Sequence, residues 1–392
     1  MANWEAMVGR ALENLRSPDA AVRSDAALTL GKLEAPEAPA ELVGRAIEAL
    51  SRILDDPDEY VRKSAVHALG RLRHRDPRAL EGIRFALGDR SEQVVQEALN
   101  QILQAPDPGA VAGLVRVLGR RERNLQTAAV DALKRVGPAA VRPLLETLRD
   151  RGSRRRVQNL ALRIIMDLRG RAVEPLLAAL QDENVHIRES AIALLCRLGD
   201  ERVVEPLVRL FLADGRMQEA VVNHLPRLEE RGVIEPPHGD REAQLPPQVA
   251  AAFRKLASPQ TEESLRAALG HPNPKVRKFA MRALFDVAGA RSKEELLRLL
   301  EDEDLDVRRI AIKLLGKLHD KSVIEPLLAL LTKGAGQLEE AIWNTIKVLT
   351  DLREYEALRS RVARERAGAP AKPTVRVFKG RDVSADWWRE QD

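Results

Sequence analysis

Arginines gather in two short stretches of the sequence, residues 120–123 and 151–156. Residues 116–171 contain 15 Lys or Arg against 5 Asp or Glu, a local charge of +10 in a chain whose formal net charge is +5. Guanidinium groups bind phosphate and carboxylate oxygens, and a cluster of them focuses a positive field. The sequence therefore predicts a patch for an anionic partner. Its candidate residues are Arg120, Arg121, Arg123, Arg151, Arg154, Arg155 and Arg156.

The chemistry of this anionic partner stays open at the level of the sequence. Nucleic-acid phosphates, an anionic lipid surface and an acidic protein segment all fit such a patch, and the ordinary alternative is that the arginines are simply solvated. Residues 116–171 contain no Phe, Tyr or Trp, whereas base recognition needs aromatic or hydrogen-bonding groups beside the charge. For a nucleic acid, the pattern thus predicts salt-sensitive contacts with the backbone only.

Two adjacent tryptophans, Trp387 and Trp388, lie within the last six residues. Exposed aromatic side chains flanked by charges are typical of anchors that enter a pocket of a partner protein. We therefore predict that this pair anchors a protein partner. The alternative is that the two rings cover the open end of the last helix pair, because terminal units of a stack need a shielded edge.

The sequence lacks the signatures of a catalytic site. It has no glycine-rich phosphate loop, no nucleophile elbow and no pair of His residues at metal-ligand spacing. His224 is expected to be a hydrogen-bonded core residue, whereas His67 and His186 should face solvent. Cys196 adjoins core positions and is expected to be a small buried residue. We predict a protein that is not an enzyme, with no catalytic residues, no cofactor and no metal.

Composition restricts the class of protein. Of the 392 residues 44% are hydrophobic, 31% charged and only 3% aromatic, which excludes wholesale disorder and favours helix over strand. No stretch approaches the roughly 18 to 20 apolar residues of a membrane span. The single cysteine forms no internal disulfide, and no signal peptide is recognisable. We expect a cytoplasmic protein without a membrane span.

Two apolar patterns with helical spacing recur along the chain and must position these residues. The first places apolar residues at i, i+3, i+4 and i+7, which is one stripe of an α-helix. It begins at Val141, Val173, Val204 and Ile324. A proline follows each start, in the first turn of a helix where its missing N–H costs nothing. These prolines are Pro143, Pro175, Pro206 and Pro326.

The second pattern places apolar or small residues at i, i+4, i+7, i+8 and i+11, as in residues 61–72 and 307–318. Most successive copies begin 30 to 33 residues apart. An Asp-rich turn precedes several of these helices and is expected to cap them. A glycine often follows, and we expect it to end the helix in the left-handed conformation. These glycines are Gly31, Gly70, Gly137, Gly199 and Gly316.

Paired helices with a period of about 31 residues, Asp in the turn and Val-Arg at the start of the second helix resemble HEAT repeats. The short, Ala-rich form is similar to the HEAT-like repeats of phycobilisome lyases, which also occur in many bacterial proteins of unrelated role. The resemblance covers about residues 2–350. It implies an all-α protein, an α-solenoid superhelix of about eleven helix pairs with a large concave face and a non-helical C-terminal tail.

The resemblance also implies a structural role for an arginine at the second position of the second pattern. In HEAT-like repeats this Arg typically pairs with Asp in a neighbouring turn, and Asp58, Asp182 and Asp304 are the expected partners. Gln126 and Gln158 replace the Arg in the two copies with arginine-rich turns. The arginines are Arg23, Arg62, Arg188, Arg277 and Arg308.

We expect four segments in the chain. Residues 1–228 form N-terminal HEAT-like repeats, and residues 229–247 form a Pro-rich insertion in a degenerate repeat, because four prolines cannot lie inside helices. Residues 248–366 form C-terminal repeats that end in a capping helix, and residues 367–392 form a flexible tail. The predicted inward residues of the capping helix are Leu352, Tyr355, Leu358 and Val362.

Binding without turnover is the predicted function. A stack of nearest-neighbour units offers extended area but no preorganised catalytic cluster, so we expect a scaffold or adaptor that contacts protein partners through its concave face, its basic edge and its C-terminal tail. The resemblance implies an alternative, a lyase-type or modification-assisting subunit related to phycobilin lyases. A further alternative is a protein that binds the phosphate backbone of nucleic acid.

Overall fold

The computed structural model describes residues 4–149, 155–237 and 242–367. Throughout these ranges the regular elements are α-helices and short 3₁₀ helices, as expected for an all-α protein. The chain divides into two units. Unit 1 comprises Met1–His238 with Leu245–Ser264, and unit 2 comprises Gly239–Gln244 with Leu265–Asp392. Within the described part of the chain, no helix has the length and apolar character needed to cross a membrane.

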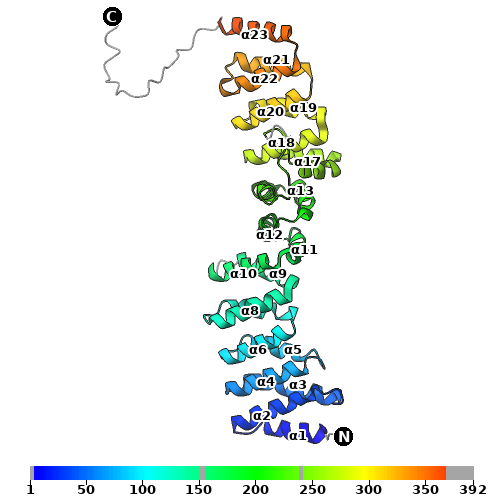
Figure 1. Cartoon of the computed structure of the whole chain (residues 1–392), viewed down its shortest axis with the longest axis vertical. Coiled ribbons are helices and arrows are strands. Elements are labelled where there is room, and N and C mark those ends of the chain that lie inside the picture. Colours follow the sequence, from blue (N-terminus) through cyan, green and yellow to red (C-terminus); the bar gives the residue numbers. More distant parts are fainter. Residues whose placement is uncertain (1–3, 150–154, 238–241, 368–392) are drawn as a thin grey trace, which may run out of the picture. The chain divides into compact units, whose positions relative to one another are not determined.

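Unit 1 is a series of antiparallel helix pairs (Figure 1). Its helices are α1 (Trp4–Asn14), α2 (Ala20–Leu30), α3 (Ala40–Arg52), α4 (Glu59–Leu72), α5 (Ala79–Ala86), α6 (Glu92–Gln104), α7 (Val111–Leu118), α8 (Arg123–Val136), α9 (Val141–Arg149), α10 (Arg155–Leu168), α11 (Val173–Ala179), α12 (Val185–Leu198), α13 (Val204–Ala213), α14 (Gln218–His224), α15 (Pro226–Glu230) and α16 (Pro247–Lys255). The boundary with unit 2 falls within α17 (Pro259–Ala268).

Unit 2 continues the same pairing. Its helices are α18 (Pro274–Ala288), α19 (Lys293–Arg298), α20 (Leu305–Lys317), α21 (Ile324–Thr332), α22 (Glu339–Leu349) and α23 (Leu352–Ala367). Short 3₁₀ helices join many helices of both units: η1 (Gly31–Glu34), η2 (Ile53–Asp55), η3 (Pro108–Ala110), η4 (Gly137–Ala140), η5 (Arg169–Ala172), η6 (Glu201–Val203), η7 (Gly215–Met217), η8 (Gly289–Ser292), η9 (Leu299–Glu301), η10 (Lys321–Val323) and η11 (Gly336–Leu338). Both units are α-solenoid stacks.

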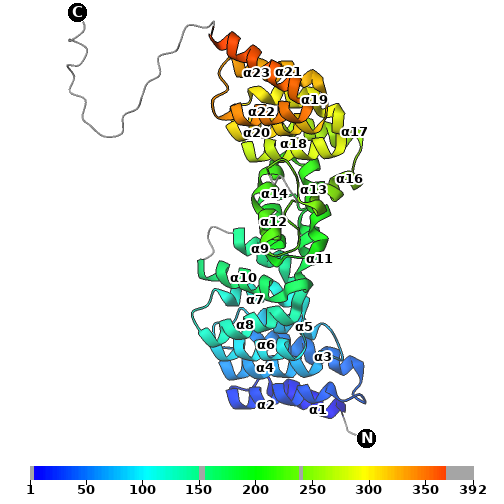
Figure 2. The same ribbon diagram turned by 45° about the horizontal axis from the view of Figure 1, so that its top comes forward.

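The second helices of successive pairs pack directly against one another. In unit 1, α2, α4, α6 and α8 lie side by side in both views (Figures 1 and 2). The predicted stripe of α4 is fully buried at Val61, Ala65, Leu69 and Leu72. Burial of a side chain of this size contributes about 1.5 to 3 kcal/mol. The apolar stripes therefore hold each pair to the next, as the sequence predicted.

The prolines of the first pattern lie where they were predicted. Pro143, Pro175, Pro206 and Pro326 are each the third residue of their helix, in α9, α11, α13 and α21. The N–H groups of the first turn have no partner within the helix, so a proline there removes no hydrogen bond.

The left-handed conformation predicted for the glycines is found at Gly199, is met in φ alone at Gly137 and is wrong at the other three. Gly137 and Gly199 have positive φ values of 76° and 72° and follow α8 and α12. Gly31 follows α2 with φ −60°, and Gly70 and Gly316 lie inside α4 and α20. Their role is close packing of neighbouring second helices. A Cβ atom would lie 3.2 Å from Ala68 at Gly31, 2.0 Å from Gln101 at Gly70 and 3.0 Å from Thr345 at Gly316.

After the Pro-rich segment, α16 packs against α13. The rings of Phe211 and Phe253 meet edge to face with their centroids 6.2 Å apart, and both side chains are fully buried. The predicted decayed repeat therefore still contributes a helix to the core of unit 1.

The capping helix α23 covers α22 through three of its four predicted residues. Val362 is buried, and Tyr355 and Leu358 pack on the core of unit 2. Tyr355 also meets Trp343 of α22 edge to face at 5.7 Å. Leu352 is 71% exposed, so its prediction as an inward residue is wrong. It is the first residue of α23, and the buried contacts of the helix are made further along.

A ladder of ion pairs links consecutive turns. In the repeat of α4, the Nη1 of Arg62 donates to the carbonyls of Asp56 and Pro57 in its own turn, at 2.8 and 3.1 Å. Its Nε and Nη2 donate to both carboxylate oxygens of Asp89 in the next turn, at 2.8 and 3.0 Å. The hydrogen bond to Asp89 raises the pKa of the Arg62 guanidinium. One side chain therefore ties two repeats together.

Three further arginines repeat this arrangement. The ion pairs are Arg23 with Asp56, Arg188 with Asp214 and Arg277 with Asp302. Burial alone would raise the pKa of Asp56, but the hydrogen bonds from Arg23 and from the backbone N–H of Asp58 outweigh burial and lower it. Each ladder arginine also donates to two carbonyls of the turn before its helix.

The predicted ladder is confirmed, but its predicted carboxylates are wrong. Asp58 and Asp304 cap α4 and α20 by accepting hydrogen bonds from backbone N–H groups. The pairing residue lies two positions earlier in the turn, as Asp56 and Asp302 show. The carboxylate of Asp182 pairs instead with Arg142, at 3.2 Å, because the preceding second helix carries glutamine in place of the ladder arginine.

Arg308 was expected to belong to the ladder and does not. Its Nε is buried without a hydrogen-bond partner among the described residues. The turn before α22 contains no aspartate, so the next repeat offers no carboxylate.

Replacement of Arg62 by Ala should lower the free energy of unfolding by about 3 kcal/mol, because the change leaves a buried carboxylate and two carbonyls without their hydrogen-bond donor. Arg62 and Asp89 are only 4% and 9% exposed. Urea denaturation followed by circular dichroism measures the change. Arg52→Ala is the matched control, since Arg52 is 80% exposed and its loss should cost about 0.5 kcal/mol or less. Equal effects of the two substitutions would contradict a structural ladder.

Gly70→Ala should lower the free energy of unfolding by about 1 to 2 kcal/mol, although alanine is the better helix former. The new methyl group would overlap the side chain of Gln101, which is held by hydrogen bonds with Glu97 and Arg73. Gly9→Ala in α1 is the control, because nothing lies within 4 Å of a Cβ there, and it should raise stability slightly. The same denaturation experiment compares the two, and a stabilising Gly70→Ala would refute close packing at this glycine.

Candidate interaction surface

Five of the seven predicted patch arginines lie in the described part of the chain. Arg121, Arg123 and Arg155 are exposed. Arg123 and Arg155 are the first residues of α8 and α10, two helices in contact. Arg120 precedes α8 and Arg156 is the second residue of α10, and both have structural partners. Arg151 and Arg154 lie outside the described residues.

Arg120 replaces a missing ladder arginine. In α6 the ladder position is occupied by Val95, which cannot donate to the carbonyl of Asp89 in its own turn. Arg120, from the following turn, donates to that carbonyl through its Nη2. The guanidinium thus approaches from the turn that normally supplies the carboxylate, and the direction of the ladder is reversed.

The same reversal recurs one repeat later. The amide Nε2 of Gln126 donates to the carbonyls of Leu118 and Arg120, as a ladder arginine would. Its Oε1 accepts a hydrogen bond from Nη2 of Arg156 in the next repeat. Arg120 and Arg156 therefore each bond to a neighbouring repeat, and Arg120 occupies the place before α8 where other turns carry the ladder aspartate.

The start of α8 also lacks the usual cap. In α4, α6, α12, α18 and α20, the residue before the helix accepts a hydrogen bond from a backbone N–H. Glu122 makes no such bond before α8, and the first turn of α8 contains no acidic residue. Arg123 instead places its charge at the positive end of the helix, which is unfavourable by about 0.3 to 1 kcal/mol.

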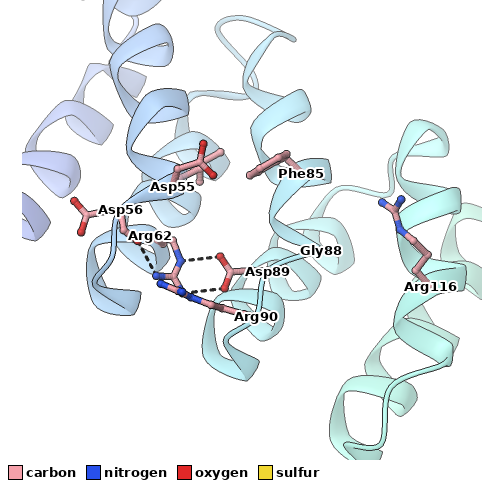
Figure 3. A pocket seen from close by; sticks show the side chains of 9 residues that line it. Asp55, Asp56, Arg62, Phe85, Gly88, Asp89, Arg90 and Arg116 are labelled. Atoms are coloured by element: carbon pink, nitrogen blue, oxygen red, sulfur yellow. Dashed lines mark hydrogen bonds and ion pairs between the residues drawn. The ribbon is translucent and has the colours of Figure 1, made fainter.

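A cavity of about 690 Å³ lies beside these turns in unit 1 (Figure 3). Arg116 lines it from α7, while Phe85 and Asp55 point toward one another from α5 and η2. Its lining residues are Leu54, Asp55, Asp56, Arg62, Phe85, Gly88, Asp89, Arg90 and Arg116. Arg120, in the turn before α8, binds the backbone of the lining residue Asp89.

The cavity has an apolar centre between unlike charges. Two of its carboxylates, Asp56 and Asp89, are engaged by ladder arginines. Phe85 is 60% exposed, so its ring is open to contact with an apolar group. Arg90 and Arg116 are exposed and line the cavity. An apolar group with acidic neighbours is chemically complementary to this lining.

Together these residues define the arginine edge: Arg90, Arg116, Arg121, Arg123 and Arg155. Arg90 donates only to the carbonyl of Pro57, at 3.2 Å. None of the five forms an ion pair with a carboxylate of the described ranges. Sequence reasoning missed Phe85, Arg90 and Arg116 as members of one surface. The sequence does indicate that Phe85 is exposed, because it falls outside the buried stripe of α5, which includes Ala79, Ile83 and Ala86.

A second groove, of about 410 Å³, lies over α4 and α6. Its polar groups bond to one another: Ser91 donates to Glu59 at 2.5 Å, Gln96 to Asn100 at 3.1 Å and Asn124 to Glu92 at 2.6 Å. A ligand would have to replace these bonds, whereas the arginine edge offers charges that no carboxylate of the described chain engages.

The remaining predicted residues are one cysteine, three histidines and the tryptophan pair. Cys196 is fully buried as predicted, and burial raises the pKa of its thiol to about 12. His224 is half-buried, but its Nδ1 has no hydrogen-bond partner among the described residues, so the predicted bond is absent there. Burial and the charge of Arg227 lower the pKa of His224. His67 and His186 are exposed as predicted. Trp387 and Trp388 lie outside the described residues.

Comparison with known proteins agrees with this architecture. A family model described as HEAT repeats matches residues 10–104 and 262–346. A comparison with curated proteins gives no match.

Among solved structures, the chain is similar to the complex of CpcE and CpcF of phycocyanin lyase from Nostoc sp. PCC7120, with 22% identity over 63% of this chain and 92% of that chain and a TM-score of 0.30. It is similar to importin beta, with 15% identity over 92% and 57% of the two chains and a TM-score of 0.37. It is also similar to an engineered protein, with 19% identity over 93% and 99% and a TM-score of 0.31.

At such TM-scores the likenesses say nothing about an activity or a partner. The family match and the stacked helix pairs agree on the architecture. Residues 10–104 and 262–346 are HEAT repeats, and the chain therefore contains HEAT repeats in each of its two units.

Proposed function

We propose that this protein is a non-catalytic scaffold or adaptor that binds an acidic segment of a partner protein along the arginine edge. An apolar side chain of the segment lies against Phe85, and acidic residues beside it pair with Arg90, Arg116 and the arginines at the starts of α8 and α10. The output of the protein is the complex that it forms.

The observation that carries this proposal is the set of exposed arginines without carboxylate partners. In other repeats the turn before the second helix supplies an aspartate to the ladder, as Asp89 does for Arg62. Before α8 that aspartate is replaced by Arg120, and Arg121 and Arg123 add charge that nothing in the described chain cancels. A patch of this kind attracts anions and raises the rate at which they associate.

The lining of the cavity favours an acidic protein segment over nucleic acid. Asp55 is exposed on the cavity wall, and a continuous phosphate backbone crossing it would meet a like charge. A peptide can place carboxylates over Arg90 and Arg116 and an uncharged side chain over Phe85. Stacking of several bases needs several rings, and the cavity lining contains one.

The tryptophan pair supplies a second contact in this proposal. Trp387 and Trp388 are flanked by Asp386 and Arg389 in the sequence. Large rings beside charges are common among the residues that dominate binding at protein interfaces. Two contacts joined by one chain raise the effective concentration of the second after the first has formed.

Reversal of three charges tests the arginine edge directly. The triple variant Arg121→Glu, Arg123→Glu and Arg155→Glu should weaken binding of a fluorescein-labelled peptide, five glutamates on either side of a leucine, by about tenfold or more at low salt. Fluorescence anisotropy measures the dissociation constant, and added salt should weaken binding to the wild type more than to the variant. A duplex DNA of twenty base pairs is titrated in parallel.

A second triple variant controls for net charge. Lys333→Glu, Lys347→Glu and Arg353→Glu change exposed residues of unit 2 by the same total charge, and peptide affinity should stay within about twofold of the wild type. If both triple variants lose affinity equally, the effect is one of net charge and the edge is not the site. If the wild type binds the duplex strongly and the peptide not at all, the partner is nucleic acid and the proposal fails.

Phe85→Ser tests the apolar contact separately from the charges. The substitution should weaken binding of the leucine peptide about threefold to tenfold, because the leucine loses its apolar neighbour. A peptide with serine in place of the leucine should bind the wild type and the variant equally. Tyr60→Ser is the matched control, since Tyr60 is 58% exposed and does not line the cavity. Equal affinity of the wild type for the two peptides would show that Phe85 is not part of the site.

A further inference from the structure

Arg169 occupies a backbone position that neighbouring repeats give to glycine. Gly137, Gly199 and Gly289 follow α8, α12 and α18 with φ values of 76°, 72° and 54°. At the same place after α10 stands Arg169, with a φ of 49°. A side chain in this left-handed region strains the backbone. The adjacent Gly170, where nothing lies within 4 Å of a Cβ, does not take that position.

Arg169 lines a cavity together with two further arginines. The cavity, of about 350 Å³, lies between the ends of α10 and α12, and Arg197 and Arg231 complete its basic lining. Glycine at position 199 leaves space for the aliphatic part of the Arg231 side chain, because a Cβ at that glycine would lie 3.0 Å from the Cβ of Arg231. Met166, Val173 and Leu198 contribute the apolar part of the wall.

The carboxylates near this cavity are engaged elsewhere. Asp200 also lines it, and its oxygens accept hydrogen bonds from Nε and Nη2 of Arg202, both at 2.8 Å. The pKa of Asp167 is lowered first by a hydrogen bond from Lys134 and only in smaller part by the charge of Arg169. Arg169, Arg197 and Arg231 form no ion pair with a carboxylate of the described residues.

We infer that this cavity is a binding site for a phosphomonoester dianion. Guanidinium groups match phosphate oxygens with paired hydrogen bonds, and three of them around one small cavity are complementary to a dianion. The strained backbone of Arg169 is then explained, since an arginine at this position places a guanidinium that glycine cannot supply. Strain of this kind is concentrated at functional sites.

This site is independent of the arginine edge. The arginine edge comprises residues of α7, of the turns before α6 and α8 and of the first turns of α8 and α10, whereas this cavity lies at the C-terminal ends of α10 and α12. Two kinds of ligand present a phosphomonoester dianion: a small phosphate ester and a phosphorylated side chain of a partner protein.

Isothermal titration calorimetry of the full chain at pH 7.5 tests the inference, with inorganic phosphate, a five-residue alanine peptide with a central phosphoserine, and its unphosphorylated form as probes. The wild type should bind at least one phosphate probe and not the unphosphorylated peptide. A phosphopeptide that binds at least tenfold more tightly than phosphate identifies a phosphorylated side chain as the source. Comparable or tighter binding of phosphate identifies a small ester.

Arg169→Gly separates a binding role from a structural one. It should weaken binding of the phosphate probe about tenfold while raising the melting temperature, because glycine relieves the strain. His319→Gly is the matched control: His319 has a φ of 53° after α20, so this variant should also gain stability but bind phosphate as the wild type does.

Arg231→Ala should weaken binding of the phosphate probe to a similar extent as Arg169→Gly. Undiminished binding by Arg169→Gly, or binding of neither phosphate probe by the wild type, overturns the inference without bearing on the arginine edge.

Discussion

The apolar stripe of each second helix finds its burial against the second helix of the neighbouring pair. Val61 and Leu69 of α4 are fully buried in such a contact, and a helix pair on its own would leave this surface in water. The stack therefore forms only when the apolar stripes of successive second helices are aligned in the same way from pair to pair. Glycines such as Gly70 follow from this constraint, because they lie where two helices approach too closely for a Cβ.

The regular alignment of helix pairs also determines which charged residues of successive repeats meet. When every pair is stacked in the same way, equivalent turns face each other, and a residue type at one position meets its counterpart in the next repeat. Because equivalent turns face each other, Arg62 meets Asp89 of the next repeat and forms a buried ion pair with it. Where Val95 and Arg120 occupy those positions instead, the carbonyl of Asp89 is still satisfied, but the carboxylate that the ladder has at this place is replaced by the guanidinium of Arg120. Positive charge on the arginine edge is thus a product of the same geometry that neutralises charge in other repeats.

The sequence predicts what depends on a single helix and fails where a neighbour decides. Stripes, helix starts at Pro143 and Pro175, and caps such as Asp58 are local, and they are found where expected. The choice between Asp56 and Asp58 as the partner of an arginine is not local, since both lie in one turn and only stacking determines which carboxylate faces the preceding pair. Gly70 was misread for the same reason.

The candidate surfaces were only partly predictable, again for physical reasons. Clustered arginines are visible in the sequence, but the structural bonds of Arg120 and Arg156 depend on residues about 30 positions away. The cavity that joins Phe85 to Arg116 brings together three repeats. Arg169 could have been found, because the glycines after α8 and α12 mark a left-handed position that the intervening repeat fills with arginine.

Residues 120–169 break three local rules of the fold. The first helix residue Arg123 opposes the helix dipole, Glu122 provides no cap, and Arg169 stands in the left-handed region. Each departure costs on the order of 0.5 to 1 kcal/mol. The same residues lie in the stretch between the two segments matched by the family model. In a stack whose stability is a sum of neighbouring interfaces, interior repeats with regular caps and ladders on either side can carry such a cost. The departures are tolerable there because neighbouring interfaces supply the stability that they cost. Two of them, Arg123 and Arg169, also add positive charge, which fits the anion binding that we propose at the arginine edge and beside Arg169.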